Sequence, residues 1–575
     1  MKKISFFALA LAAGLMMGCS DEVGNDVNPG GTGSATVGEG FMSVAINLPS
    51  TTGGSRASVD GFDDGLEGEY AVKEGKLLIF GGASEDAATL QAEYTLPGVT
   101  TGWTDESGQI TTTKTIAVST TTMTGPKFYA VVVLNPNSQN LGLTTGTSKL
   151  ADLEAKTLTI GEDALRKNGF LMTNAPLSTV PGGVSQPSGV TIMKYPEFDA
   201  TKIKSDATAA MQDPAATIYV ERIHAKVTLT EGQSMSSPST ALGTMDVLAW
   251  ALDNTNKSTY LMRNAKASDA WWAYKSTKTG NPAPEYRFIE DDPVAENLYR
   301  TYWCTDPNYN AAYNASNFNT ITETNVTTAP GTTPLYCLEN TFDTDHMTEQ
   351  NTTAVIVKAQ FNNGNDFYVA NSDYTTIYDE NGAKGIVKAM LMEYVETIKT
   401  TYIKTGTMDG DDIATVTLAT DADKKVSATA ITLGDCQGIE FQDTPNDKSA
   451  LEKALNDYLT TLNRNLNVYL YEDGIAYYRL LIKHFGDEDT PWAESDKSGT
   501  DSYPDATGGA TGENQWLGRY GMVRNNWYDI TVTGARELGS PTIPEVTTSW
   551  DDDVNNLAVT INILSWAKRS QSVIL

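Results

Sequence analysis

Apolar and polar residues alternate near the beginning of the chain. From residue 41 to 48 every second residue is large and apolar: Met42, Val44, Ile46 and Leu48. An alternation with a period of two is typical of a β-strand that buries one face. Proline has no N–H to donate to a strand ladder, so we expect this strand to end before Pro49. A loop rich in Gly and Ser follows it.

Short apolar runs between Gly, Pro and Asn turns recur from residue 57 to about residue 215, and from about residue 230 the pattern is looser. Two segments of this second part carry apolar residues four positions apart, which predicts helices. These residues are Ile386, Met390, Tyr394 and Ile398, then Leu451, Leu455, Tyr458 or Leu459, and Leu462. The fold class is therefore β-rich, all-β to α+β, with two tandem β-sandwich domains, 57–216 and 217–555, and a few helices in the second.

Two local patterns complete this picture. Residues 218–229 alternate as one strand and place His224 on its more polar face, so we expect a solvated histidine there. Residues 468–471 and 475–484 flank the turn Glu472-Asp473-Gly474, which predicts a β-hairpin.

The chain end carries its own alternating segment, residues 556–575. Leu557, Val559, Ile561 and Ile563 alternate with other residues, and a tail follows that contains Trp566, Val573, Ile574 and Leu575. A bare apolar tail with β-propensity must pair with a strand edge, because otherwise it favours aggregation.

Residues 1–19 have the pattern of a bacterial lipoprotein signal peptide. Lys2 and Lys3 precede an apolar run, residues 4–17, which is too short to span a bilayer as a helix. The run ends at Gly18-Cys19, and this pair looks like a lipobox that would place acyl chains on Cys19. The acidic residues that follow resemble the tag that sends Bacteroidetes lipoproteins to the outer face of the outer membrane. Ordinary secretion with a chance cysteine is the alternative.

Composition excludes several function classes. The 575 residues carry a formal charge of −31, which argues against nucleic-acid binding. The chain has three His and shows no nucleotide-binding, metalloprotease or hydrolase motif, so we expect no catalytic residue, metal or cofactor. Cys304 and Cys337 could form a disulfide, which would leave Cys436 over.

A single arginine links these features. Between Cys19 and Lys73 the only basic residue is Arg56, in the soft loop behind the first strand. An Arg-specific protease that cuts between Arg56 and Ala57 would free the propeptide 20–56 together with that strand. The tail of another subunit could then fill the vacated place by β-strand addition, which predicts a head-to-tail polymer of identical subunits.

The sequence also resembles a known family, the fimbrilins of Bacteroidales type V pili, and among them most the shaft subunits of the short (minor) fimbrium. The residues that carry the resemblance are Tyr520–Tyr528, Leu538–Pro541 and Ile561–Trp566, with weaker matches at Phe170–Asn174, Val220–Val227 and Tyr477-Tyr478. The resemblance implies transthyretin-like sandwiches, a transient lipid anchor in the outer membrane, and removal of the first strand by an Arg-specific protease at Arg56. It also implies donor strands at the C-terminus and further partners in the anchor and tip subunits of the fimbria.

Two other functions fit parts of the sequence. A tip adhesin of the same system would use the Trp271/Trp272 region to bind a glycan. A surface glycan-binding lipoprotein or glycosidase would keep residues 20–56 in the mature protein. The presence of both Arg56 and the apolar tail favours the shaft subunit.

Overall fold

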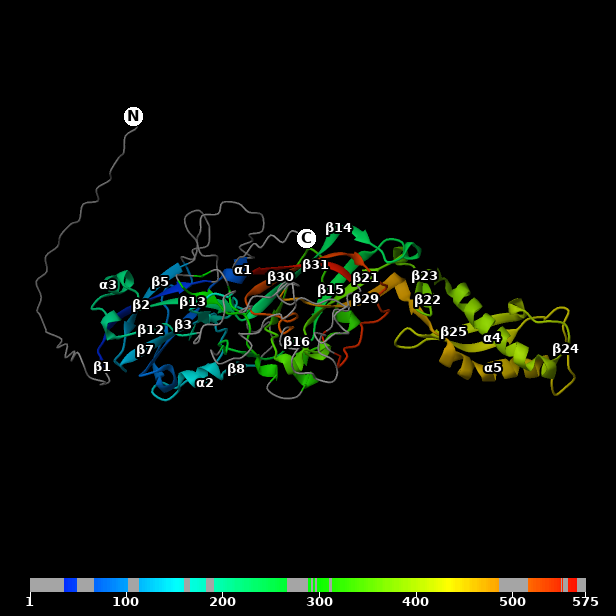
Figure 1. Cartoon of the computed structure of the whole chain (residues 1–575), viewed down its shortest axis with the longest axis horizontal. Coiled ribbons are helices and arrows are strands. Elements are labelled where there is room, and N and C mark those ends of the chain that lie inside the picture. Colours follow the sequence, from blue (N-terminus) through cyan, green and yellow to red (C-terminus); the bar gives the residue numbers. More distant parts are fainter. Residues whose placement is uncertain are drawn as a thin grey trace, which may run out of the picture.

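The computed structural model describes residues 36–48, 67–101, 113–159, 166–182, 191–265, 288–290, 293–294, 297–309, 313–485, 516–549, 551 and 557–565. The molecule is elongated, with β2 (Gly40–Asn47) toward one end and the helices α4 (Glu380–Tyr402) and α5 (Lys448–Asn465) at the other (Figure 1). Within the described ranges no helix combines the length and apolar character needed to cross a membrane.

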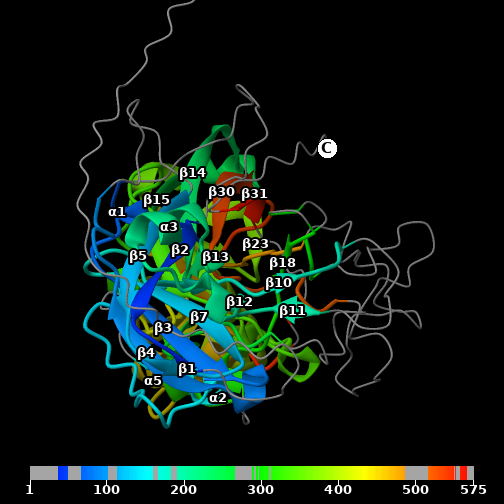
Figure 2. The same cartoon turned by 90° about the vertical axis from the view of Figure 1, so that its left-hand side faces the viewer.

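The N-terminal region is built on one mixed sheet with the strand order β4-β3-β7-β9-β13-β2-β5, and β12 lies beside β7. Residues from both halves of the sheet share one core, so the sheet folds around it in two layers. Viewed from this end, β2 lies between β5 and β13 (Figure 2). The remaining elements of the region are β1 (Thr36–Val37), α1 (Glu67–Tyr70), β3 (Gly75–Gly82), β4 (Thr89–Thr95), β5 (Thr113–Thr120), β6 (Met123–Thr124), β7 (Lys127–Leu134), α2 (Leu150–Glu154), β8 (Thr157–Leu158), β9 (Met172–Asn174), β10 (Leu177–Ser178), β11 (Ile192–Met193), β12 (Glu197–Phe198), α3 (Ala207–Gln212) and β13 (Ala216–Arg222).

The central region holds a second core between two sheets. One sheet has the order β20-β14-β30-β31, the other β15-β21-β29, and side chains from both sheets fill the same cluster. The elements are β14 (His224–Ser236), β15 (Asp246–Asp253), β16 (Thr255–Asn256), β17 (Thr259–Tyr260), β18 (Tyr299–Arg300), β19 (Phe318–Asn319), β20 (Leu335–Leu338), β21 (Ala354–Gln360), β29 (Ile475–Leu481), β30 (Asn526–Ala535) and β31 (Leu557–Ser565).

A third core lies at the distal end, inside the predicted second domain. Helices α4 and α5 pack against the ribbon β25–β26, and each begins at an aspartate, Asp379 or Asp447, whose side chain accepts a backbone N–H of the first turn. The other elements are β22 (Phe367–Ala370), β23 (Asp373–Tyr378), β24 (Ile403–Thr405), β25 (Ile413–Thr420), β26 (Val426–Leu433), β27 (Glu440–Phe441) and β28 (Val468–Tyr471).

The β-rich fold class, both helices and the strands at the two chain ends are confirmed. Within α4, however, the deepest stripe is Ala383, Val387, Leu391 and Val395, next to the predicted stripe rather than on it. The predicted hairpin at residues 468–484 is wrong. β28 pairs with β22, and β29 pairs with β21, because the turn at Glu472–Gly474 carries the chain from one sheet to another.

Candidate functional site

The predicted first strand, β2, is an internal strand that is hydrogen-bonded along both edges. It pairs antiparallel with β5 from Gly40 to Asn47 and parallel with β13 from Val44 to Asn47. Where β13 does not reach, the N–H and C=O of Phe41 pair with Lys204 at 2.8 Å each. Removing β2 would therefore leave two facing strand edges with unpaired backbone groups, and such edges bind a new strand.

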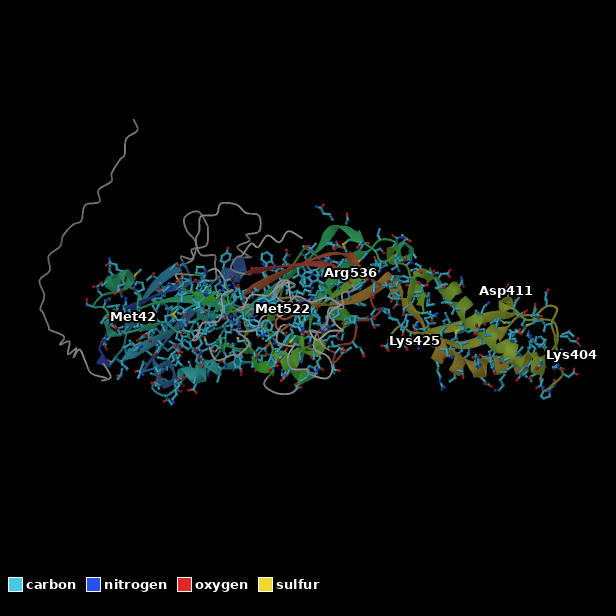
Figure 3. All side chains as sticks on the ribbon, viewed as in Figure 1. Met42, Lys404, Asp411, Lys425, Met522 and Arg536 are labelled. Carbon is cyan, nitrogen blue, oxygen red and sulfur yellow. The ribbon has the colours of Figure 1, made fainter. Side chains whose placement is uncertain are left out.

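Both faces of β2 are covered as well. Met42, Val44 and Ile46 are 0% exposed and point into the N-terminal core, and Leu48 is buried beside them. On the opposite face, Ser43 and Ala45 are 0% and 7% exposed. Figure 3 marks Met42 in this region, opposite Lys404 at the distal tip.

Helix α3 covers the outer face of β2. The Ser43 hydroxyl donates a 2.6 Å hydrogen bond to the carbonyl of Ala210, and the Ala215 N–H donates to the carbonyl of Ser43 at 2.8 Å. The site therefore holds, in β2, a strand with large residues inward and the small residues Ser43 and Ala45 outward. Sequence reasoning found the inward residues from their alternation and missed Ser43 and α3, because no local pattern shows what will cover the outer face.

One wall of this site continues directly into the central region. Only Ile223 separates β13 from β14, so a nearly unbroken chain path leads from the site to the sheet that contains β30 and β31. The predicted single strand over 218–229 is thus two strands in two sheets. His224, predicted to be solvated, is 0% exposed, with its ring edge-on to Phe170 at 5.3 Å, because both faces of the strand are covered at the junction of the two regions.

Four buried charged side chains hold this junction. Arg263 donates to Glu221 at 2.8 Å, and Arg524 donates to Glu339 at 3.0 Å. The two pairs lie side by side, with Arg263 Nε 3.6 Å from Glu339 Oε2. Burial raises the pKa of Glu221, while the neighbouring arginines oppose that shift. Glu221 belongs to β13 and Arg524 precedes β30, so the cluster joins the N-terminal region to the C-terminal sheet.

A second buried pair fixes the segment that follows the predicted cleavage point. Glu69 of α1 is 1% exposed and lies 2.9 Å from Lys226 Nζ, and Tyr336 donates to its carboxylate at 2.6 Å. Lys226 also lies over the Trp527 ring, 4.1 Å from its centroid. Glu69 was not predicted as a site residue, because in an acidic chain an isolated glutamate gives no signal.

The motif at 520–528 serves the same junction. The Asn525 N–H donates to the carbonyl of His224 at 2.7 Å, and the Asn525 side chain accepts from the Arg222 N–H at 3.3 Å. The Tyr528 hydroxyl lies 2.8 Å from His484 Nδ1, and burial lowers the pKa of His484 to about 3, so this histidine is neutral at physiological pH.

The C-terminal strand β31 has a sheet neighbour on one side within the described part of the chain. It pairs antiparallel with β30 from Leu557 to Ser565 and forms the last strand of its sheet. Val559 and Ile561 are only half-buried against the central core, unlike the inward residues of β2. The strand lies at the upper side of the central region, beside β30 (Figure 1).

Several predicted site residues lie outside the described residues: Cys19, Arg56, Ala57, Trp566, Val573, Ile574 and Leu575. The Trp271/Trp272 region does as well. Cys304 and Cys337 are both buried, and the structure holds them as reduced thiols instead of the disulfide that the sequence allowed. Cys337 belongs to the central core, where apolar side chains surround its thiol, whereas Cys304 lies outside that cluster.

One family model matches the C-terminal segment of the chain. Residues 502–572 match the model of a family described as "Major fimbrial subunit protein type IV, Fimbrillin, C-terminal". The matched segment contains the motif at 520–528, β30 and β31, so the similarity to fimbrial subunits lies in the sheet that ends the chain. The C-terminal segment of the chain is thus similar to the C-terminal part of fimbrillins.

Solved structures give weaker likenesses, and no curated protein matches the sequence. A candidate cell adhesion protein from Parabacteroides distasonis ATCC 8503 has 10% identity and a TM-score of 0.37, covering 93% of this chain and 99% of its own. A fimbrilin (FimA) from Porphyromonas gingivalis W83 has 13% identity and a TM-score of 0.34, covering 92% and 99%. The tip fimbrial protein Mfa3 from Porphyromonas gingivalis has 10% identity and a TM-score of 0.30, covering 92% and 100%. Likenesses of this size establish neither a ligand nor an assembly mode for this chain.

Proposed function

We propose that the chain is a shaft subunit of a cell-surface fimbria and that it polymerises by donor-strand exchange. The precursor is exported as a lipoprotein through Cys19 and held transiently by its acyl chains in the outer membrane. An Arg-specific protease cuts between Arg56 and Ala57, and the freed propeptide takes β2 with it. The partners are identical subunits along the shaft and anchor and tip subunits at its ends.

The observation that carries this proposal is the internal position of β2. Its removal opens an apolar slot with two unpaired strand edges. Exposure of this slot to water is unfavourable for the mature subunit, so the slot must be filled. Four inward side chains at about 2 kcal/mol each make refilling worth on the order of 8 kcal/mol, before backbone hydrogen bonds and the ordering cost of the new strand. The slot therefore binds a strand of matching pattern from another subunit.

The donor in this proposal is the tail of the C-terminal segment 556–575, with Trp566, Val573, Ile574 and Leu575, which follows β31. Residues 557–563 repeat the pattern of residues 42–48, with identical residues at three matching positions: Val44 and Val559, Ile46 and Ile561, Asn47 and Asn562. The strand that leads into the tail thus has the side-chain order that the slot holds, while β31 itself stays paired with β30 in its own subunit. Slot and donor are different surfaces, so the contact is head-to-tail and extends as a filament instead of closing.

N-terminal sequencing of fimbriae sheared from cells tests the proposal. We expect polymerised subunits to begin at Ala57 and the variant Arg56→Lys to accumulate as unpolymerised precursor, because an Arg-specific protease does not accept lysine. The substitution keeps the charge and the length, so it serves as its own control for folding. Polymer that begins at Cys19, or normal fimbriae from Arg56→Lys cells, contradicts the proposal.

A further inference from the structure

The proposed processing raises the question of why one arginine is cut while the rest of the chain survives the same protease. Such a protease needs the arginine side chain in its specificity pocket and several residues of extended backbone in its cleft. Nine arginines lie in the described part of the chain, at positions 166, 222, 263, 300, 464, 479, 519, 524 and 536. The structure shows how each of them is withheld.

Seven of the nine are withheld through their side chains. Arg222, Arg263, Arg519 and Arg524 are buried, and the side chain of Arg479 is 8% exposed and paired with Asp253. Arg300 is half-buried in β18, and the half-buried Arg166 places its guanidinium over the Tyr336 ring, 4.9 Å from the centroid. None of these side chains can enter a protease pocket without local unfolding.

The side chains of the other two, Arg464 and Arg536, are exposed, but hydrogen bonds hold the backbone around them in place. Arg464 is in the last turn of α5, so its peptide bonds are helical. The residues after Arg536 (labelled in Figure 3) are tied down: Tyr478 donates to the carbonyl of Glu537 at 3.1 Å and Tyr471 donates to the carbonyl of Gly539 at 2.8 Å. Neither segment can become extended while the fold is intact.

Lysine shows the opposite distribution. Lys226 is the only fully buried lysine within the described ranges, and lysines such as Lys73, Lys167 and Lys257 carry the positive charge of exposed loops. Lysine carries the more strongly hydrated charge and suits an exposed loop, whereas the guanidinium of arginine suits buried ion pairs and stacking. One consequence of this division is that few described arginines are open to a protease.

We infer that the fold itself shelters the nine described arginines from arginine-specific processing, and that the exposed loops of the described residues carry lysine in their place. The determinants are the junction ion pairs, the Arg166–Tyr336 contact and the bonded backbone at Arg464 and Arg536. The biological role of this protection rests on the proposed function. The resistance of the arginines to cutting is a property of the folded monomer, so it can be measured without fimbriae.

The turn at Arg166-Lys167 offers a matched test, because the two neighbours share one backbone and differ in side-chain exposure. The Asn168 N–H donates to Asn137 Oδ1 at 2.8 Å, so cutting after either residue needs the same local opening of the backbone and the two rates compare the side chains. Native full-length chain and the variant Lys167→Arg are digested separately with an arginine-specific and a lysine-specific endoprotease, and the cut bonds are identified by mass spectrometry. We expect the lysine-specific enzyme to cut wild type after Lys167. We expect the arginine-specific enzyme to cut the variant after residue 167 at least about tenfold faster than it cuts wild type after Arg166.

Two results would overturn the inference. One is cutting of native wild type after any of the nine arginines at the rate seen in Lys167→Arg. The other is resistance of residue 167 in both digests, since the backbone of the turn and not the side chain would then give protection. Fimbriae from Arg56→Lys cells would contradict the proposed function but leave both digests unchanged, so the two failures are distinguishable.

Discussion

Arg524 Nη2 lies 3.0 Å from Glu339 Oε1, and both side chains are almost completely buried at the junction of the N-terminal and central regions. Arg524 belongs to the segment that matches the fimbrillin C-terminal family, and Glu339 follows β20. The pair, with Glu221 and Arg263, holds β13 against the sheet of β14, β30 and β31. A wall of the proposed strand slot is thus fixed to the sheet that carries the proposed donor.

Loss of one cation from this junction should be costly. Arg524→Met leaves two buried carboxylates facing one arginine, so we expect the free energy of unfolding of the junction to fall by about 3–5 kcal/mol. Urea denaturation followed by tryptophan fluorescence measures the change. Arg464→Met removes an exposed arginine from α5 and should alter stability by less than about 0.5 kcal/mol. Equal effects of the two substitutions would argue against the junction.

Substitutions in β2 should destabilise the precursor and leave the fimbria unaffected. Ile46→Ala removes a fully buried side chain, and we expect it to lower precursor stability by about 2–5 kcal/mol. Fimbriae made from this variant should melt like wild type, because the mature subunit no longer contains β2. Ile116→Ala, in the β5 wall opposite Val44, should weaken both forms. Fimbriae weakened by Ile46→Ala would show that β2 stays in place.

Removal of the tail should stop assembly after processing. We expect deletion of residues 566–575 to yield subunits that begin at Ala57 but remain monomeric, because their slots have no donor. Size-exclusion chromatography with N-terminal sequencing separates this outcome from a failure of cleavage. Full-length polymer from the deleted chain would show that the tail is dispensable.

His484 should make the fold sensitive to acid. Its pKa is about 3 when folded, below the ordinary value of about 6.5, so the unfolded chain binds the proton first as the pH falls. Stability is therefore lost from about pH 6.5 down to about pH 3, and roughly 2 kcal/mol should disappear between pH 7 and pH 5. His484→Gln can still hydrogen-bond to Tyr528 and should show a smaller loss over this range. Parallel pH profiles for the two proteins would contradict the assignment.

Local sequence pattern predicted the elements whose periodicity is strong. The alternation at Met42, Val44 and Ile46 gave β2, and the leucines from Leu451 to Leu462 gave α5, because one buried face imposes a period of two or 3.6 on any sequence. The predictions of a solvated His224 and of a hairpin at residues 468–484 were wrong, because strands distant in the sequence decide burial and pairing there.

By itself, the sequence determined the strand-rich class, the apolar stripe of the first strand and the resemblance of the chain end to fimbrilins. Only the tertiary structure decided that β2 is an internal strand covered by α3, that Glu69 meets Lys226, and that Arg524 meets Glu339. The physical reason is distance along the chain. Residues 69 and 226, or 339 and 524, are so far apart in the sequence that no local pattern of apolar and polar residues contains both. Their contact exists only once the sheets have assembled and excluded water from the junction.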